Sequence, residues 1–311
     1  MYNSKKYWNM KKALGIILLL CIQQLYSQNE LLLSSKVNRD NSIDINYKKT
    51  MPGNYFVYLN FKQYDNTYPP KTKFVADSYN GFLFGLTPID KNRGITYSYS
   101  YMYYRGILNA KIEPEFVYLL PFKDNTSFEA SFLYNIDARY FNKQEPKNWK
   151  SFQFTCNKTD TICSARKGVV IDVVDIYSID TTKSYSYSSQ RNYIIIEHKD
   201  GTFAKYEGLD GKNIFVKQGD IVLPNQSLGK LIQYDKSGTY QLRFTIDYLI
   251  ENPSEKENTI QRFSYACIDP FFQSTEGVAK LVSQKTYTTK ISEDQILKEL
   301  SKKEIKNRQK K

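Results

Sequence analysis

The chain has 311 residues, enough to bury one large core or two medium ones, and two domains are the better expectation. Its formal net charge is +12, from 44 Lys and Arg against 32 Asp and Glu. Such a basic surface suits anionic envelope polymers, peptidoglycan carboxylates or lipid headgroups as neighbours, and it equally suits plain solvation. Nucleic acid is disfavoured as a partner, because the sequence carries no recognition motif and no single dense basic face.

Residues 1–27 have the pattern of a secretory signal peptide. Four lysines precede the apolar stretch 13–22, and cleavage is expected before Gln28. The stretch is too short to span a bilayer, so no stable transmembrane span is predicted. A lipoprotein interpretation through Cys21 is weaker, because Leu20 stands where a small residue is usual. Cleavage would lower the net charge from +12 to +8, since these residues hold four lysines and no acid.

Three cysteines remain after that cleavage, in a compartment where disulfides persist. Cys156 and Cys163 are separated by one short turn, and we expect them to pair, which would leave Cys267 odd. Three buried thiols are the alternative. Because His198 is the only histidine of the chain, a structural zinc site of the usual Cys and His kind is not expected.

Residues 28–120 are rich in Tyr, Asn and β-branched residues and are predicted to form a β-sandwich-like domain. Alternation is clearest from Ile95 to Tyr103, where large or aromatic residues recur at every second position, as in a half-buried strand. This tyrosine face could stack on sugar rings, although such faces more often pack in the core or across strands. Strands are expected at SIDINY (42–47), YFVYLNF (55–61), GFLFGLTP (81–88), ITYSYSYMYY (95–104) and EPEFVYLLPF (113–122).

A second domain is assigned to residues 121–270, because Pro121 and the polar run after it mark a boundary. Residues 128–149 are polar and irregular, and we expect a loop packed over a sheet. Strands are expected within 151–174. The insertion 177–190 lacks a hydrophobic period and is predicted to be a surface loop.

The most regular part of the chain runs from Arg191 to Tyr248. Strand-like runs alternate there with turn signals, which predicts a compact antiparallel sheet and an all-β fold for the whole chain. The turn signals are Asp200-Gly201, Asp210-Gly211 and Gln218-Gly219-Asp220.

Residues 271–311 are predicted to be an extension that ends in a short basic helix, 292–311. Ser292 and Gln295 match a capping box, and Ile296 and Leu300 fall near one stripe of that helix. The stripe is thin and the chain ends in NRQKK, which favours a frayed, solvated helix over a membrane anchor.

The order of these segments resembles the β-core of the LytM, or lysostaphin-type, zinc peptidases. The resemblance covers roughly residues 118–248, less than half of the chain, and YLLPF (118–122) is similar to the opening segment of LytM-like domains from Bacteroidetes-type bacteria. It implies the fold of that core, and zinc as the cofactor of the active relatives. The matching pieces are SFQF (151–154), IIIEHKDGTFAKYEGL (194–209), VKQGDIVLPNQSLG (216–229) and YQLRF (240–244).

The same resemblance places a substitution at every chemical position of the site. Active members hold zinc through H-x-x-x-D and the second histidine of H-x-H, and use histidines of Y-x-H-L and H-x-H to handle protons. Arg243 is the strongest argument against a zinc site, because a permanent cation at a ligand position repels the metal ion in addition to removing a metal–ligand bond. No cofactor and no catalytic residue are therefore expected here. The five degenerate positions are Trp149, Gln153, Gly208, Gln241 and Arg243.

Three other residues, Glu207, Asp247 and His198, are the candidates for a site that replaces the lost one. Glu207 and Asp247 are interpreted as exposed polar positions on edge strands, and His198 as a hydrogen-bonding turn residue rather than a new ligand. Arg243 and Gln241 could meet a ligand carboxylate through charge-assisted hydrogen bonds, or Arg243 could pair locally with Glu207. These three, Arg243, Gln241 and Glu207, are the predicted binding residues.

The favoured function is an exported, catalytically inactive LytM-like module that binds peptidoglycan or an envelope hydrolase. The expected location is the periplasm or cell surface of a Gram-negative, Bacteroidetes-like bacterium. One alternative is an active zinc metalloendopeptidase that cleaves peptidoglycan cross-links with a non-standard ligand set. Another is an envelope scaffold in which the N-terminal sandwich is the binding part.

Overall fold

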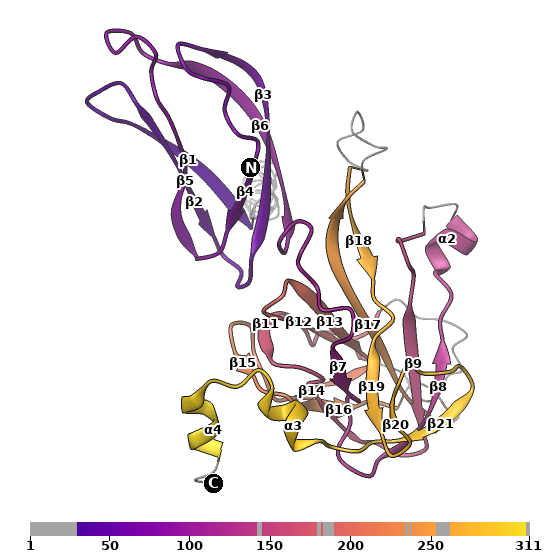
Figure 1. Ribbon diagram of the computed structural model, residues 1–311. Coiled ribbons are helices and arrows are strands. Elements are labelled where there is room, and N and C mark those ends of the chain that lie inside the picture. Colours follow the sequence, from indigo (N-terminus) through magenta and orange to yellow (C-terminus); the bar gives the residue numbers. More distant parts are fainter. Residues whose placement is uncertain are drawn as a thin grey trace, which may run out of the picture.

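The structure is a computed structural model, and it describes residues 30–141, 145–178, 182, 190–233, 236, 238–252 and 262–308. The predicted signal peptide and most of the 177–190 insertion lie outside the described residues. The described chain is built mainly of antiparallel strands, with short helices near its C-terminus, so the predicted all-β fold is confirmed (Figure 1). None of the helices in the described part of the chain has the length and apolar character needed to cross a membrane.

The first part of the chain is a sandwich of two three-stranded sheets, of order β1-β2-β5 and β4-β3-β6. Tyr97, Tyr99 and Tyr101 of β6 pack against the core between these sheets, which supports core packing for the tyrosine face. Part of the predicted fifth strand, β7 (Val117–Leu119), pairs instead with β19 (Phe271–Ser274) far along the chain. The sandwich strands are β1 (Leu31–Val37), β2 (Ile43–Lys49), β3 (Tyr55–Asp65), β4 (Lys73–Ala76), β5 (Asn80–Leu86) and β6 (Thr96–Arg105).

The second part centres on a nine-stranded sheet of order β15-β11-β12-β13-β17-β9-β8-β21, with β18 paired to the end of β17. One face of this sheet packs through Phe154, Phe244 and Ile246 against a smaller sheet of order β10-β16-β14. The strands of the large sheet are β8 (Ser127–Phe132), β9 (Ser151–Cys156), β11 (Gly168–Val174), β12 (Tyr193–Glu197), β13 (Thr202–Glu207), β15 (Ile221–Val222), β17 (Tyr240–Glu251), β18 (Phe263–Cys267) and β21 (Lys285–Thr288). The remaining strands are β10 (Thr161–Cys163), β14 (Leu209–Ile214), β16 (Ser227–Leu231) and β20 (Gly277–Ala279), the last paired with β19.

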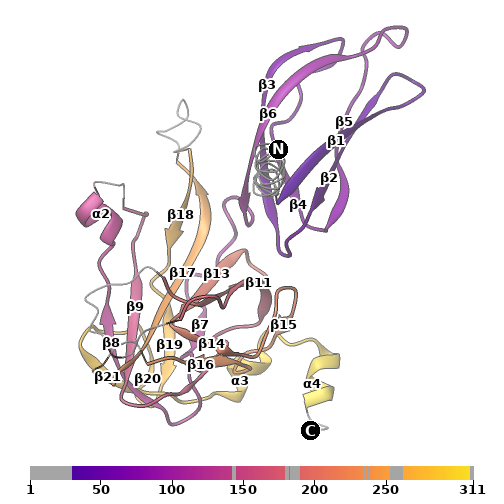
Figure 2. The ribbon, with the colours of Figure 1, turned by 180° about the vertical axis from the view of Figure 1, so that it is seen from behind.

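The two parts meet along the extension of β17. Both ribbon views show β17 and β18 rising out of the lower sheets beside the sandwich (Figures 1 and 2). Phe56 and Tyr58 of β3 share a hydrophobic cluster with Leu249 of β17 and Phe263 of β18. The Arg262 guanidinium donates to the Tyr58 hydroxyl at 2.8 Å. Strand β17 therefore belongs to the large sheet at one end and to the sandwich contact at the other.

Two local predictions need correction. The segment 128–149 is not one loop, because β8 and the helix α2 (Ile136–Phe141) lie in it, and β8 pairs with β9. Asp210-Gly211 is not a turn between strands, because both residues lie inside β14, whose register with β16 is irregular. The local Gly signal there marks an irregular strand rather than a chain reversal.

The C-terminal prediction is also wrong in part. The expected single helix is two short ones, α3 (Glu293–Leu297) and α4 (Lys302–Arg308), and Ser292 makes no side-chain cap. The segment is docked rather than solvated, since Ile296 is fully buried. Between the helices, Glu299 reaches a buried arginine described below.

Candidate functional site

Three of the predicted site residues, Gln153, Glu207 and Arg243, lie on the face of the large sheet opposite the core. Successive side chains of a strand point to opposite faces, so burial of Leu242 and Phe244 turns Arg243 to the other side. Strand register sets Arg243 of β17 directly beside Gln153 of β9 and, on its other flank, Glu207 of β13. The structure thus brings three of the predicted residues into one row across three strands.

Gly208 and Gln241 lie next to each other beside this row, Gly208 directly after Glu207 and Gln241 two residues before Arg243. Gly208 has φ +110°, a conformation that L side chains rarely adopt, and a Cβ there would lie 2.2 Å from the Gln241 carbonyl oxygen. Arg191 donates from Nη2 to the Gln241 side-chain oxygen at 3.5 Å. No side chain fits at position 208 without movement of the β17 backbone.

Trp149 does not join this row. It precedes β9 and donates its indole N–H to the Leu133 carbonyl at 2.8 Å, on the side of β8. Glu207 is engaged locally, because its carboxylate pairs with Lys205 at 2.6 Å, and the Lys205 ammonium lies 4.5 Å from the centre of the Tyr193 ring. The ion pair shown for Glu207 is thus with Lys205, the neighbour two residues away on β13.

Zinc does not fit this set of side chains. The row offers an amide, a guanidinium and a carboxylate held by lysine, and Gly208 offers no side chain at all. Within the described ranges, no group of three or more His, Cys, Asp and Glu side chains is arranged to hold a metal ion. A tetrahedral zinc site needs three such ligands and one open position.

Residues 147–256 match the sequence profile described as "Peptidase family M23". This segment is an M23 domain. The LytM-type resemblance expected from the sequence is confirmed, over a somewhat different range.

Three of the solved structures to which the chain is similar have TM-scores below 0.3. The SpoIIQ-SpoIIIAH pore forming complex gives 20% identity, covering 44% of this chain and 85% of that chain, with a TM-score of 0.28. A zinc containing peptidase from Vibrio cholerae gives 12% identity, 70% and 78% coverage and a TM-score of 0.29. Helicobacter pylori Csd3 gives 12% identity, 91% and 77% coverage and a TM-score of 0.27. No curated protein matches the chain.

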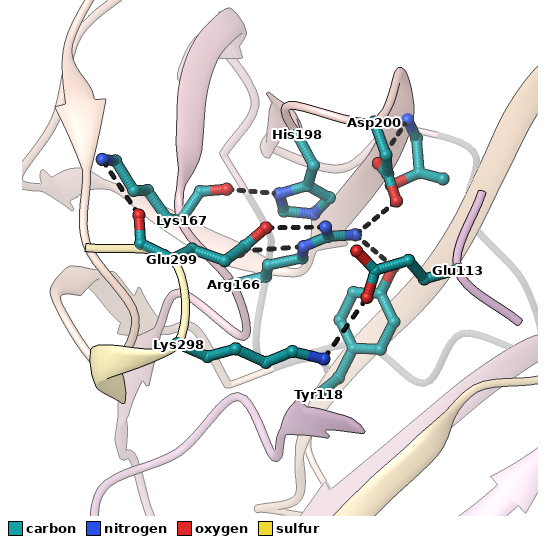
Figure 3. Close-up of polar contacts among 9 residues, drawn as sticks. Glu113, Tyr118, Arg166, Lys167, His198, Asp200, Lys298 and Glu299 are labelled. Carbon is teal, nitrogen blue, oxygen red and sulfur yellow. Dashed lines mark hydrogen bonds and ion pairs between the residues drawn. The ribbon is translucent and has the colours of Figure 1, made fainter. Parts of the chain in front are cut away.

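A buried charge cluster beside the M23 sheet was missed by sequence reasoning (Figure 3). Arg166 is only 2% exposed, and its guanidinium reaches between Asp200 at 2.6 Å and both oxygens of Glu299 at 2.7 and 2.9 Å. The Arg166 Cζ atom also lies 3.7 Å from the centre of the Phe116 ring. Arg166 therefore ties the hairpin after β12 and the C-terminal segment to the edge of the domain.

His198 stands next to this cluster and is a turn residue, as predicted. Its Nδ1 shares a hydrogen bond of 2.8 Å with the Lys167 carbonyl, which must accept, so the neutral ring carries its proton on Nδ1. Burial, and then the charge of Arg166, lowers the pKa of His198 to about 4. The ring is neutral at physiological pH and cannot serve there as a cation.

Asp247 is the second residue whose position was not foreseen. It lies on β17, which is flanked there by β13 and β18, and Glu207 lies on the interior strand β13, so neither is on an edge strand. Burial raises the pKa of Asp247 to about 7, while the charge of Lys205 opposes the shift. The alternation in YQLRFTID places Asp247 on the face of Arg243, and this signal was present in the sequence.

The predicted disulfide between Cys156 and Cys163 is wrong, because both are free, buried thiols, as is Cys267. Cys156 ends β9 of the large sheet, whereas Cys163 ends β10 of the small sheet. Each packs as a small apolar side chain. The alternative of three buried thiols describes the structure.

These thiols are expected to be inert in the native protein. Burial raises the pKa of Cys156 to about 12 and that of Cys163 and Cys267 to about 11, so little thiolate forms at pH 8. Intact mass measured after iodoacetamide treatment should show no alkylation of these three residues in buffer and complete alkylation in denaturant without reductant. Rapid alkylation in buffer, or a thiol that reacts only after reduction, would contradict this.

Proposed function

We propose that the M23 domain is a catalytically inactive module of an exported cell-envelope protein, and that it binds peptidoglycan or an envelope hydrolase. What supports this is the row in which Gln153, Arg243 and Glu207 stand side by side on the face of the sheet opposite the core. By the resemblance to the LytM family, Gln153 and Arg243 of this row occupy positions where the active relatives carry metal ligands, and both can form hydrogen bonds. The proposed location is the periplasm or surface of a Gram-negative, Bacteroidetes-like bacterium.

The chemistry of the row favours a carboxylate ligand. Arg243 contributes a planar guanidinium with a permanent charge, which matches the geometry of a carboxylate better than an ammonium would. Gln153 and Gln241 can add neutral donors on the flanks. Stem peptides of peptidoglycan present carboxylates of this kind, so the row and the polymer are complementary in charge.

Retention on purified sacculi tests the proposal. Replacing Arg243 with alanine is expected to weaken retention of the full chain roughly 10- to 100-fold, because a hydrogen bond to a charged group contributes about 1.5–3 kcal/mol. The matched control is Arg39→Ala, which removes the same charge from an exposed position in the sandwich. Equal retention of wild type and Arg243→Ala would remove the row as the binding surface.

Zinc content and muropeptide release, measured on the same purified protein, distinguish this binding function from peptidoglycan hydrolysis. The purified chain is expected to contain no stoichiometric zinc and to release no muropeptides from sacculi. Stoichiometric zinc together with chelator-sensitive release would instead establish an active peptidase with a ligand set of its own.

A further inference from the structure

A small pocket lies where the sandwich meets the polar face of the M23 sheet, apart from the row around Arg243. It has a volume of about 220 Å³, the room of several water molecules. Its apolar walls are Ile171, Ile195 and Phe203, from three neighbouring strands. Arg105 at the end of β6 closes it from the sandwich side.

The charged groups that line this pocket are already paired, with one exception. Arg105 donates to Asp172 at 2.7 Å and to Glu30 at 3.0 Å. Lys205 is held by Glu207 at 2.6 Å, as described above.

Tyr265 also has its partner, since its hydroxyl donates to the Arg105 carbonyl at 2.9 Å. The exception is Asp247, which accepts no hydrogen bond and forms no ion pair among the described residues.

The Asp247 carboxylate is partly buried in this pocket, beside Lys205 and Arg105, which are held by other acids. A carboxylate that has lost part of its hydration and has no ion-pair partner is stabilised by a cation that brings its own hydrogen-bond donors. The walls suit an unbranched aliphatic arm. From this geometry we propose that the pocket binds a primary alkylammonium group, with its nitrogen on the Asp247 carboxylate and its chain against Ile171, Ile195 and Phe203. The group could come from a lysine-like side chain of a peptide or from a free amine.

The proposed site differs from the larger cavity beside His198, which has a volume of about 530 Å³. There the Lys49 ammonium donates to the carbonyls of Met51 and Gly53, and the Glu197 carboxylate accepts from the backbone and side chain of Asn54. Lys49 and Glu197 therefore already have partners in that cavity.

Calorimetric titration of the full chain tests the proposal with n-pentylamine and with Nα-acetyl-lysine methylamide as probes, and n-pentanol as the uncharged analogue. At pH 8 we expect both amines to bind and Asp247→Asn to weaken that binding at least about tenfold. The matched control is Glu129→Gln, an exposed acid on the same sheet, which should leave affinity unchanged. A preference for the lysine derivative would point to a peptide source, and a preference for pentylamine to a free amine.

Binding should also depend on pH in a defined direction. The groups that face Asp247 are Lys205 from β13, Arg105 from β6, and Tyr265 and Cys267 from β18, and burial raises the pKa of both Tyr265 and Cys267 above the range used. Between pH 5.5 and 8 the carboxyl of Asp247 is therefore the group expected to titrate there, and the amines stay protonated. Affinity should rise with pH in wild type and stay level in Asp247→Asn.

Either of two results would overturn the proposal: no binding of the amines at pH 8 up to millimolar concentration, or equal affinity in wild type and Asp247→Asn. Both are independent of sacculus retention, which is tested through Arg243.

Discussion

Replacing Arg166 with methionine is expected to lower the free energy of unfolding by about 3–5 kcal/mol, because it strands two carboxylates that were paired out of solvent. Asp200 and Glu299 are held at 2.6 and 2.7 Å by a guanidinium that is 2% exposed. Methionine fills a similar volume, so the loss of stability should come mainly from the removed charge and not from a cavity. Urea unfolding at pH 7 measures it.

The same substitution should release the C-terminal segment. Glu299 connects α3 to α4, and its contact with Arg166 spans 133 residues of sequence, so limited proteolysis should cut the variant within 293–308 before the rest of the chain. The matched control is Lys298→Met, whose exposed pair with Glu113 at 3.3 Å should contribute less than about 1 kcal/mol. A loss below about 1 kcal/mol in Arg166→Met would mean that Arg166 does not anchor the segment.

Asp247→Asn is expected to become progressively more stable than wild type as the pH rises from about 4 to 7. An unfolded aspartate titrates near 3.8, whereas burial raises the folded pKa of Asp247 to about 7. Below both values the carboxyl is neutral in both states, and between them only the folded state holds the extra proton. The wild type therefore loses stability through this window, while asparagine does not.

The difference in unfolding free energy between variant and wild type should reach on the order of 2–4 kcal/mol at pH 8, since each pKa unit corresponds to about 1.4 kcal/mol. Urea unfolding at pH 4, 5.5, 7 and 8 measures this difference. Glu129→Gln, on the exposed end of the same face, should show a nearly flat profile. A flat profile for Asp247→Asn would show that the carboxyl is solvated in the folded protein.

Strand alternation carried much of what the sequence could predict. In YQLRFTID the apolar residues Leu242, Phe244 and Ile246 point to the core, so Arg243 had to face away from it. The family match then placed Gln153 and Arg243 in one site, and the register of β9 and β17 brings them together. The alternation could be predicted because it depends on residues close in sequence, whereas Gln153 and Arg243 are far apart and were linked only by the family match.

The charge cluster could not be found in this way. Arg166 and Glu299 are 133 residues apart, and nothing in either local sequence specifies the other. The loop predicted for 128–149 failed because β8 is half polar and is held in the sheet by pairing with β9 and β21, a tertiary effect that overrides weak local preference. The expected disulfide failed because closeness in sequence does not place two side chains in the same layer.

Strand β17 sets the distance between the row around Arg243 and the contact with the sandwich. Arg243 stands in the row beside Gln153 and Glu207. Eight residues further along the same strand, Glu251 forms an ion pair with Lys73 of the sandwich. At about 3.3 Å per residue, the two points are some 26 Å apart along one continuous backbone. One continuous strand joins the two points. A ligand bound at the row and a partner in contact with the sandwich would therefore be held at a constant separation.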